Sequence, residues 1–215
     1  MIQTSFSLLS AILMISAPPP PSEDESFKMA VADGYFVASG TLVPNSKEHI
    51  KAARRNDQNI KILVMQNVPG SDDDNDYLDA AWGLHQDGFT TIVPSDGLVA
   101  SGGTDFFLAG TFRIIQPGAC IGVHSWEDDG PPPYAANQLS RDHAEHGDFL
   151  EFFTAIGIAT EFYWFTINAA PASGMHWMSP AEINRFKMSS IPLAEDDEET
   201  DAERQARCDN RAIES

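Results

Sequence analysis

The chain of 215 residues contains 32 acidic and 13 basic side chains, which give a net charge of −19, and 42% of its residues are hydrophobic. This length and hydrophobic content are sufficient for one well-buried domain. The negative charge disfavours contact with a phosphate backbone, so we exclude nucleic acid as a partner and interpret the acidity as a solvated surface.

An apolar stretch over residues 6–17 precedes a run of prolines. The stretch is too short to span a bilayer but has the length of a signal-peptide core, although the first five residues contain no Lys or Arg. We therefore predict a signal peptide over residues 1–17, cleaved after Ala17, and an extracytoplasmic location, either periplasmic or secreted. An uncleaved anchor and a buried or disordered start are the alternatives. Residues 18–26 are predicted to form a Pro-rich, acidic linker, and no membrane span is expected after signal cleavage.

Residues 27–190 are predicted to form one α/β domain. Apolar patterns and turn signals indicate, in chain order, strands at 28–32 and 35–43, a helix at 45–55, a strand at 60–66, a helix at 72–85 and a strand at 90–93. The continuous apolar run at 60–66 is typical of a strand buried on both faces of a parallel sheet. The alternation of strands and helices predicts such a sheet with crossover connections.

A turn of small residues follows these elements and reads Gly97-Leu98-Val99-Ala100-Ser101-Gly102-Gly103. It leads into an apolar helix at 104–110 and a hairpin at 112–124 that ends in Gly122-Val123-His124. A serine hydroxyl is a poor nucleophile unless a base removes its proton, and a tight small-residue turn exposes such a hydroxyl. Ser101 and His124 are therefore the candidate catalytic pair. The structural alternative is a small residue in a close contact and a core histidine.

A long helix is predicted over 134–156, after three consecutive prolines, with His143 and His146 on its apolar face. This face packs either on its own domain or on another subunit. The acids beside the two histidines are Asp142, Glu145 and Asp148. Because the cluster matches no recognised motif, we predict no metal site.

Two further helices and an acidic tail complete the predicted chain. An aromatic helix is predicted at 160–169. A shorter helix at 179–188 opens with Ser179-Pro180 and carries Glu182 at capping-box spacing. Residues 191–215 are predicted to be a disordered, solvated tail.

The chain contains two cysteines, Cys120 in a predicted core strand and Cys208 in the tail. An exported protein could join them, but two free thiols are an equal alternative because pairing cannot be deduced from sequence. Neither cysteine belongs to a Cys-x-x-Cys motif, so a zinc ribbon is not supported.

The segment from Gly97 to His124 is similar to the Clp protease proteolytic subunit and its relatives in the Clp/crotonase superfamily, and it resembles in particular the extracytoplasmic Clp-like branch. In that family a glycine-led strand end carries small residues into the nucleophilic serine, a buried helix ends in Ala-Gly, and a hairpin returns to a histidine. The resemblance covers roughly residues 27–190. It implies stacked β-β-α units with a long helical insertion, and it makes a homo-oligomer plausible.

The resemblance also implies the remaining site residues. Clp-like proteins place a Pro-Gly-Gly turn at the oxyanion, where this chain reads Pro69-Gly70-Ser71, so the backbone N–H groups of Ser71 and Gly102 are the expected donors. The family's triad aspartate corresponds here to Met175, whose thioether cannot orient an imidazolium. We expect Asn168 or a backbone carbonyl to orient His124 instead.

The sequence thus predicts an exported Clp-like serine peptidase or hydrolase that acts on peptide or protein and needs no cofactor. The alternative is a catalytically impaired relative that keeps the fold as an oligomeric interaction module. A crotonase-type reaction on a thioester ranks last, because an exported protein would rarely meet coenzyme A and the Ser-His pair would have no role.

Overall fold

The structure, a computed structural model, describes residues 26–44, 46–72, 74–195 and 199–214. The predicted signal peptide at 1–17 and most of the predicted linker at 18–26 lie outside the described residues. None of the described helices is long and apolar enough to cross a membrane.

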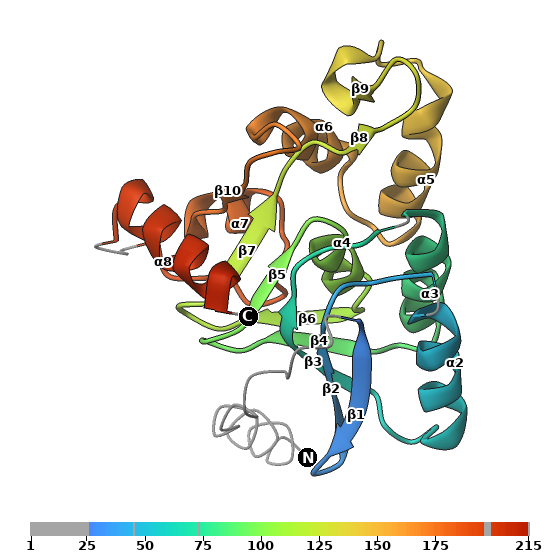
Figure 1. The fold of residues 1–215 in the computed structure, drawn as a ribbon. Helices are drawn as coiled ribbons and strands as arrows, with labels where there is room; N and C mark the ends of the chain where they lie inside the picture. Colours follow the sequence, from blue (N-terminus) through green and yellow to red (C-terminus); the bar gives the residue numbers. More distant parts are fainter. Residues whose placement is uncertain (1–25, 45, 73, 196–198, 215) are drawn as a thin grey trace.

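A mixed eight-stranded sheet forms the centre of the domain (Figure 1). Its strands are β1 (Lys28–Ala32), β2 (Tyr35–Ser39), β3 (Ile62–Val68), β4 (Thr90–Val93), β5 (Leu98–Ala100), β6 (Phe112–Ile115), β7 (Cys120–Val123) and β10 (His176–Trp177). The pairs β1/β2 and β7/β10 are antiparallel, and the other pairs are parallel. The predicted α/β class with a largely parallel sheet is therefore confirmed.

The sheet divides at β3. Residues Ile62 to Val64 pair with β4, which pairs with β6, whereas Asn67 and Val68 pair with β5, which pairs with β7. The predicted hairpin at 112–124 is therefore wrong, because β6 and β7 are consecutive in sequence but pair with different strands. The turn between them contains Gly118, whose φ of 92° lets the chain change direction from one arm to the other.

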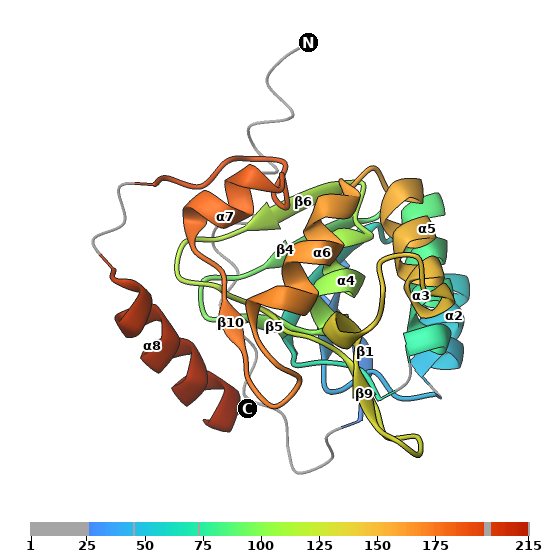
Figure 2. The ribbon, with the colours of Figure 1, turned by 90° about the horizontal axis from the view of Figure 1, so that it is seen from above.

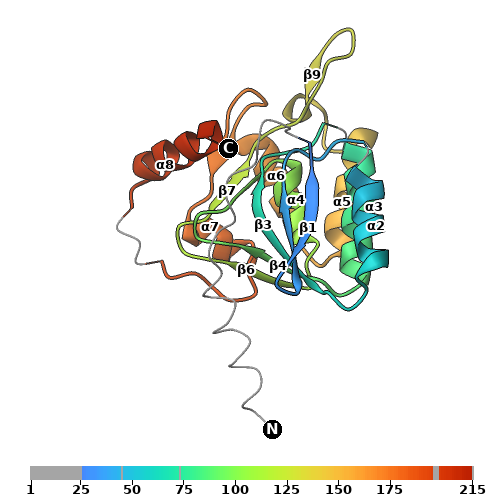
Figure 3. The same ribbon diagram turned by 60° about the horizontal axis from the view of Figure 1, so that its bottom comes forward.

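Seven helices in the described part of the chain surround the sheet. They are α2 (Ser46–Asn56), α3 (Asp74–Gln86), α4 (Gly102–Leu108), α5 (Gly147–Ala155), α6 (Thr160–Ala169), α7 (Pro180–Arg185) and α8 (Asp201–Glu214). Helices α2 and α3 lie side by side on one flank, and α4 lies in the centre (Figures 1 and 3). Gly103 of α4 approaches the Val68 carbonyl of β3 so closely that a Cβ would overlap it, which explains the glycine.

The predicted helix over 134–156 is wrong in its first half. Residues Glu127–Asp128 (β8) and Tyr134–Ala135 (β9) form a small antiparallel hairpin that projects from the domain (Figure 3). Two short 3-10 turns follow, and only α5 is α-helical. The Asp128 carboxylate accepts from the Gly130 N–H, and the Gln138 side chain accepts from the Ala135 N–H. These local hydrogen bonds compete with a helix, and so do the prolines.

The predicted disordered tail is also wrong for residues 201–214, which form α8 on the side of the sheet opposite α2 and α3 (Figure 2). A disulfide joins Cys208 of α8 to Cys120 of β7, 88 positions apart, with a Cα–Cα distance of 5.7 Å. Arg207 donates to the Gly118 carbonyl, and Arg211 donates to the carbonyls of Gly97 and Gly118. The acidic composition of the segment predicted disorder, although these arginines recur on one face of the helix.

Candidate active site

Ser101 occupies a sharp turn between β5 and α4. Its backbone has φ 52° and ψ −131°, a conformation that non-glycine residues rarely adopt. The Ser101 N–H donates to the Gly122 carbonyl of β7 at 3.1 Å, and the Thr104 hydroxyl donates to the same carbonyl at 2.8 Å. The turn is therefore fixed by the strand that leads to His124. Strained backbone held in this way is concentrated at functional sites.

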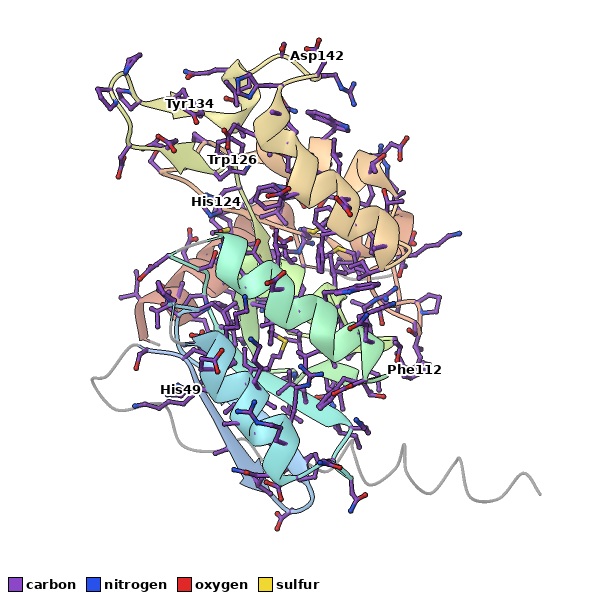
Figure 4. The ribbon with its side chains drawn as sticks, turned by 90° about the vertical axis from the view of Figure 1, so that its right-hand side faces the viewer. His49, Phe112, His124, Trp126, Tyr134 and Asp142 are labelled. Atoms are coloured by element: carbon purple, nitrogen blue, oxygen red, sulfur yellow. A yellow bond between two sulfur atoms is a disulfide. The ribbon has the colours of Figure 1, made fainter. Side chains whose placement is uncertain are left out.

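His124 directly follows β7. Because Ala100 pairs with Gly122 in the parallel β5/β7 ladder, Ser101 and His124 leave neighbouring strands at the same end. Both residues line one cavity of about 30 Å³. Figure 4 shows His124 beside Trp126 near one end of α3. The structure thus brings together the two residues that the sequence singled out.

The environment of His124 favours a neutral imidazole. Burial lowers the pKa of His124 below its ordinary value, and the backbone carbonyls of Ala172 and Ser125 act in the opposite direction. Its Nδ1 is buried and has no partner within hydrogen-bond geometry among the described residues. A neutral imidazole can accept a proton from a serine hydroxyl, so the group is suited to act as a base near neutral pH.

Asn168 does not have the predicted role. Its side chain is exposed on α6, and its amide donates to the Trp164 carbonyl one turn earlier at 2.7 Å. Met175 is half-buried, and its sulfur lies against Gly122, where a Cβ would be 2.7 Å from Sδ. Of the two expected ways to orient His124, Asn168 is therefore excluded, and orientation by a backbone carbonyl stays a prediction.

The two expected oxyanion donors lie beside the serine turn. The Leu42 N–H donates to the Gly70 carbonyl, and the Asp72 N–H donates to the Leu42 carbonyl. Because backbone groups alternate in direction along an extended chain, the Ser71 N–H points away from Leu42. The Ser71 side chain fills the space at the Gly102 Cα, where a Cβ would overlap it. The Gly102 N–H belongs to the first turn of α4 and has no acceptor within the helix.

The cavity also contains residues that the sequence analysis did not select. Asp105 lines it from α4, one turn after Ser101, and accepts a hydrogen bond from the Tyr77 hydroxyl at 2.8 Å. The remaining lining residues are Gly102, Val123, Trp126, Phe149, Phe153, Tyr163 and Thr166. Asp105 could have been found from its spacing, because residues four apart on a helix share a face. The aromatic residues come from distant segments, and no local signal connects them.

A buried polar network supports the aromatic wall. The Trp126 Nε1–H donates to the Tyr163 hydroxyl at 3.0 Å, and that hydroxyl lies 2.6 Å from His146 Nδ1. His146 is fully buried, and burial lowers its pKa. The described residues contain no group of three or more His, Cys, Asp or Glu side chains that could hold a metal ion. His146 thus packs behind the aromatic wall, whereas His143 is exposed.

No family model matches the sequence, and no curated protein matches it. Among solved structures, the chain is similar to the 1510-N membrane-bound stomatin-specific protease (14% identity, covering 75% of this chain and 78% of that one, TM-score 0.48). It is also similar to human enoyl Coenzyme A hydratase domain-containing protein 3 (9% identity, 87% and 76%, TM-score 0.45). A third similar structure is an enoyl-CoA hydratase from Polaromonas sp. JS666 (11% identity, 88% and 91%, TM-score 0.41).

Proposed function

We propose that the chain is a serine peptidase in which Ser101 is the nucleophile and His124 is the general base. The observation that carries this proposal is the Ser101 turn, which has a positive φ and opens on the same cavity as His124. A small residue with only a packing role would not require this backbone conformation. The alternation of the backbone at Ser71 and the first turn of α4 support two oxyanion donors.

The reaction follows from these positions. The Ser101 oxygen attacks the carbonyl carbon of a peptide bond while its proton passes to His124. The negative charge on the carbonyl oxygen is held by the N–H groups of Ser71 and Gly102. The carbon–nitrogen bond then breaks, and His124 returns the proton to the leaving amine. Water, deprotonated by His124, releases the acyl group from Ser101 in the same way.

The orientation of His124 sets the rate that we expect. A triad carboxylate fixes the imidazole tautomer, and replacing it by a neutral amide costs about 10⁴ in kcat in a well-characterised serine protease. In this chain Met175 occupies the corresponding position, and burial lowers the pKa of His124. We therefore expect a slow peptidase with a reactive serine. The impaired relative acting as an interaction module is the second candidate, favoured by Met175 and by the unpartnered His124 Nδ1 among the described residues.

We also propose that the protein is exported. Support comes from the disulfide between Cys120 and Cys208, both buried, because disulfides persist mainly in oxidising compartments. Self-association stays a prediction of the sequence resemblance.

The test is labelling of the mature protein with a fluorophosphonate probe, with the adduct located by mass spectrometry. We expect an adduct at Ser101 that disappears in Ser101→Ala and is reduced at least a hundredfold in His124→Ala. The matched control for the histidine is His49→Ala, because His49 is exposed on α2, away from the cavity. Absence of labelling in protein that is folded by circular dichroism would reject the peptidase and favour the interaction module.

A further inference from the structure

The cavity beside Ser101 contains a single carboxylate among its lining residues, Asp105. Asp105 lies one helical turn from Ser101 and is half-buried. Its Oδ2 accepts from the Tyr77 hydroxyl, which fixes the direction of the carboxylate. A carboxylate can accept several hydrogen bonds at once, so an additional donor can bind the same group. This places a fixed negative charge close to the atom that would attack the substrate.

The rest of the cavity wall is rich in aromatic rings. Its other side chains include five aromatic rings, namely Tyr77, Trp126, Phe149, Phe153 and Tyr163. Phe149 stacks on both Trp126 and Tyr163, with ring centroids 6.3 and 5.3 Å apart. Such a wall lowers the local dielectric and therefore strengthens the attraction between Asp105 and a cation. Aromatic rings also interact favourably with cations, whereas an anion would be repelled by the carboxylate.

The size of the cavity limits the group that it can accept. Its volume of about 30 Å³ is about twice what one water molecule needs. A primary ammonium group fits into this volume. The net charge of −19 would in addition raise the local concentration of cationic substrates.

We propose that this cavity binds a primary ammonium group of the peptide substrate, with Asp105 as the residue that determines specificity. The inference rests on the proposed peptidase function and names its substrate class. The ammonium group belongs either to a lysine-type side chain on the residue before the scissile bond or to a free amino terminus near that bond. Both present the same chemistry to Asp105.

Fluorogenic peptides separate these two sources. One arm uses N-acetylated peptides that differ only in lysine, ornithine or norleucine before the scissile bond, and the other uses the norleucine peptide with a free amino terminus. We expect one of the cationic substrates to exceed acetylated norleucine in kcat/KM by about ten- to hundredfold. Equal kcat/KM for all of them would overturn the proposal, and this comparison needs no variant.

Asp105→Asn should reduce that ratio to about one. The matched control is Asp129→Asn, which removes the same charge from the exposed turn between β8 and β9. An unchanged ratio in Asp105→Asn would overturn the proposal. Tyr77→Phe, which removes only the hydroxyl that orients the carboxylate, should lower the ratio partially.

A binding measurement distinguishes failure of the subsite from failure of the peptidase. Calorimetry with Ser101→Ala, which cannot turn over substrate, should show tighter binding of the ammonium-bearing peptide than of acetylated norleucine. Labelled Ser101 with equal binding of all peptides would reject the subsite alone. Preferential binding without any labelling of Ser101 would retain the ammonium site and reject the peptidase.

Discussion

The backbone N–H of Ser101 donates to the carbonyl of Gly122 at 3.1 Å, so the candidate nucleophile is tied to the strand that carries the candidate base. Met175 and Trp177 also pack closely over the Cα atom of Gly122. A Cβ at this position would lie 2.6 Å from the Trp177 ring and 2.7 Å from the Met175 sulfur. The geometry of the Ser-His pair therefore depends on the absence of one methyl group.

The first prediction concerns this position. Gly122→Ala should displace β10 from β7 and lower the free energy of unfolding by about 1–3 kcal/mol, because overpacking forces the surroundings to shift. Labelling of Ser101 should fall with it. Urea unfolding and the labelling rate measure the two effects. Gly147→Ala is the control, since a Cβ there meets nothing within 4 Å; equal behaviour of the two variants would contradict the prediction.

Restoring a carboxylate at Met175 should not restore a triad. The Met175 side chain packs against an apolar cluster made by Leu98, Ala100, Cys120, Trp177 and Cys208. Met175→Asp would place an ionisable group in this cluster, and we expect a loss of about 1–3 kcal/mol in stability. Met175→Leu, which keeps the volume, should be tolerated. A faster labelling rate of Ser101 in Met175→Asp would show instead that the carboxylate reaches His124.

The labelling rate of Ser101 should increase with pH and reach its plateau near neutral pH. His124 acts as a base only when it is neutral, and burial lowers its pKa below 6.5. The labelling rate should therefore be half-maximal below pH 6.5 and nearly constant from pH 7 to 8. A midpoint above pH 7 would indicate that a partner raises the pKa of His124, contrary to the described environment.

Stability should decrease on acidification because of His146. Its pKa is lowered in the folded protein, so the unfolded chain binds a proton more readily between pH 6.5 and the folded pKa. The free energy of unfolding should therefore fall as the pH falls through this window. His146→Gln should make this dependence shallower, and His49→Gln, at an exposed position on α2, is the control. Urea midpoints measured from pH 7.5 to 5 test this, and identical slopes for both variants would reject it.

Reduction of the Cys120–Cys208 disulfide should destabilise the domain. The bond closes a loop with a sequence separation of 88 residues, and chain entropy assigns about 4–5 kcal/mol to a loop of that length. The labelling of Ser101 should also fall. Helix α8 holds β10 against β7, because Gln205 donates to the Met175 carbonyl and Trp177 donates to Asp209. Guanidinium midpoints with and without reductant measure the loss, and Cys208→Ser should be insensitive to reductant.

Local signals predicted the elements that carry the site. The strand at 90–93, the serine turn, the helix at 160–169 and the cap at Ser179 all depend on residues close in sequence, and the structure has them where expected. The capping box of Ser179 and Glu182 is formed by reciprocal hydrogen bonds. The Ser-His pair was found because its spacing resembles a known family.

The remaining features depend on contacts between distant segments. Strands β6 and β7 pair with different strands because β3 changes its pairing partner along its length. No turn signal in the sequence indicates this change. Helix α8 is stabilised by a disulfide and by arginine contacts to distant carbonyls, which an acidic composition conceals. Asp105 is recognised as a candidate only in the folded structure, where aromatic residues from other segments surround it.

The link between α8 and β7 also determines when the site is complete. During synthesis the strand that carries His124 is made well before Cys208, and the contacts that hold residues 175–177 against this strand come from α8. A variant that ends after α7 would therefore lack the clamp on its histidine strand. The geometry of the Ser-His pair thus depends on a segment that lies 88 positions beyond Cys120 in sequence.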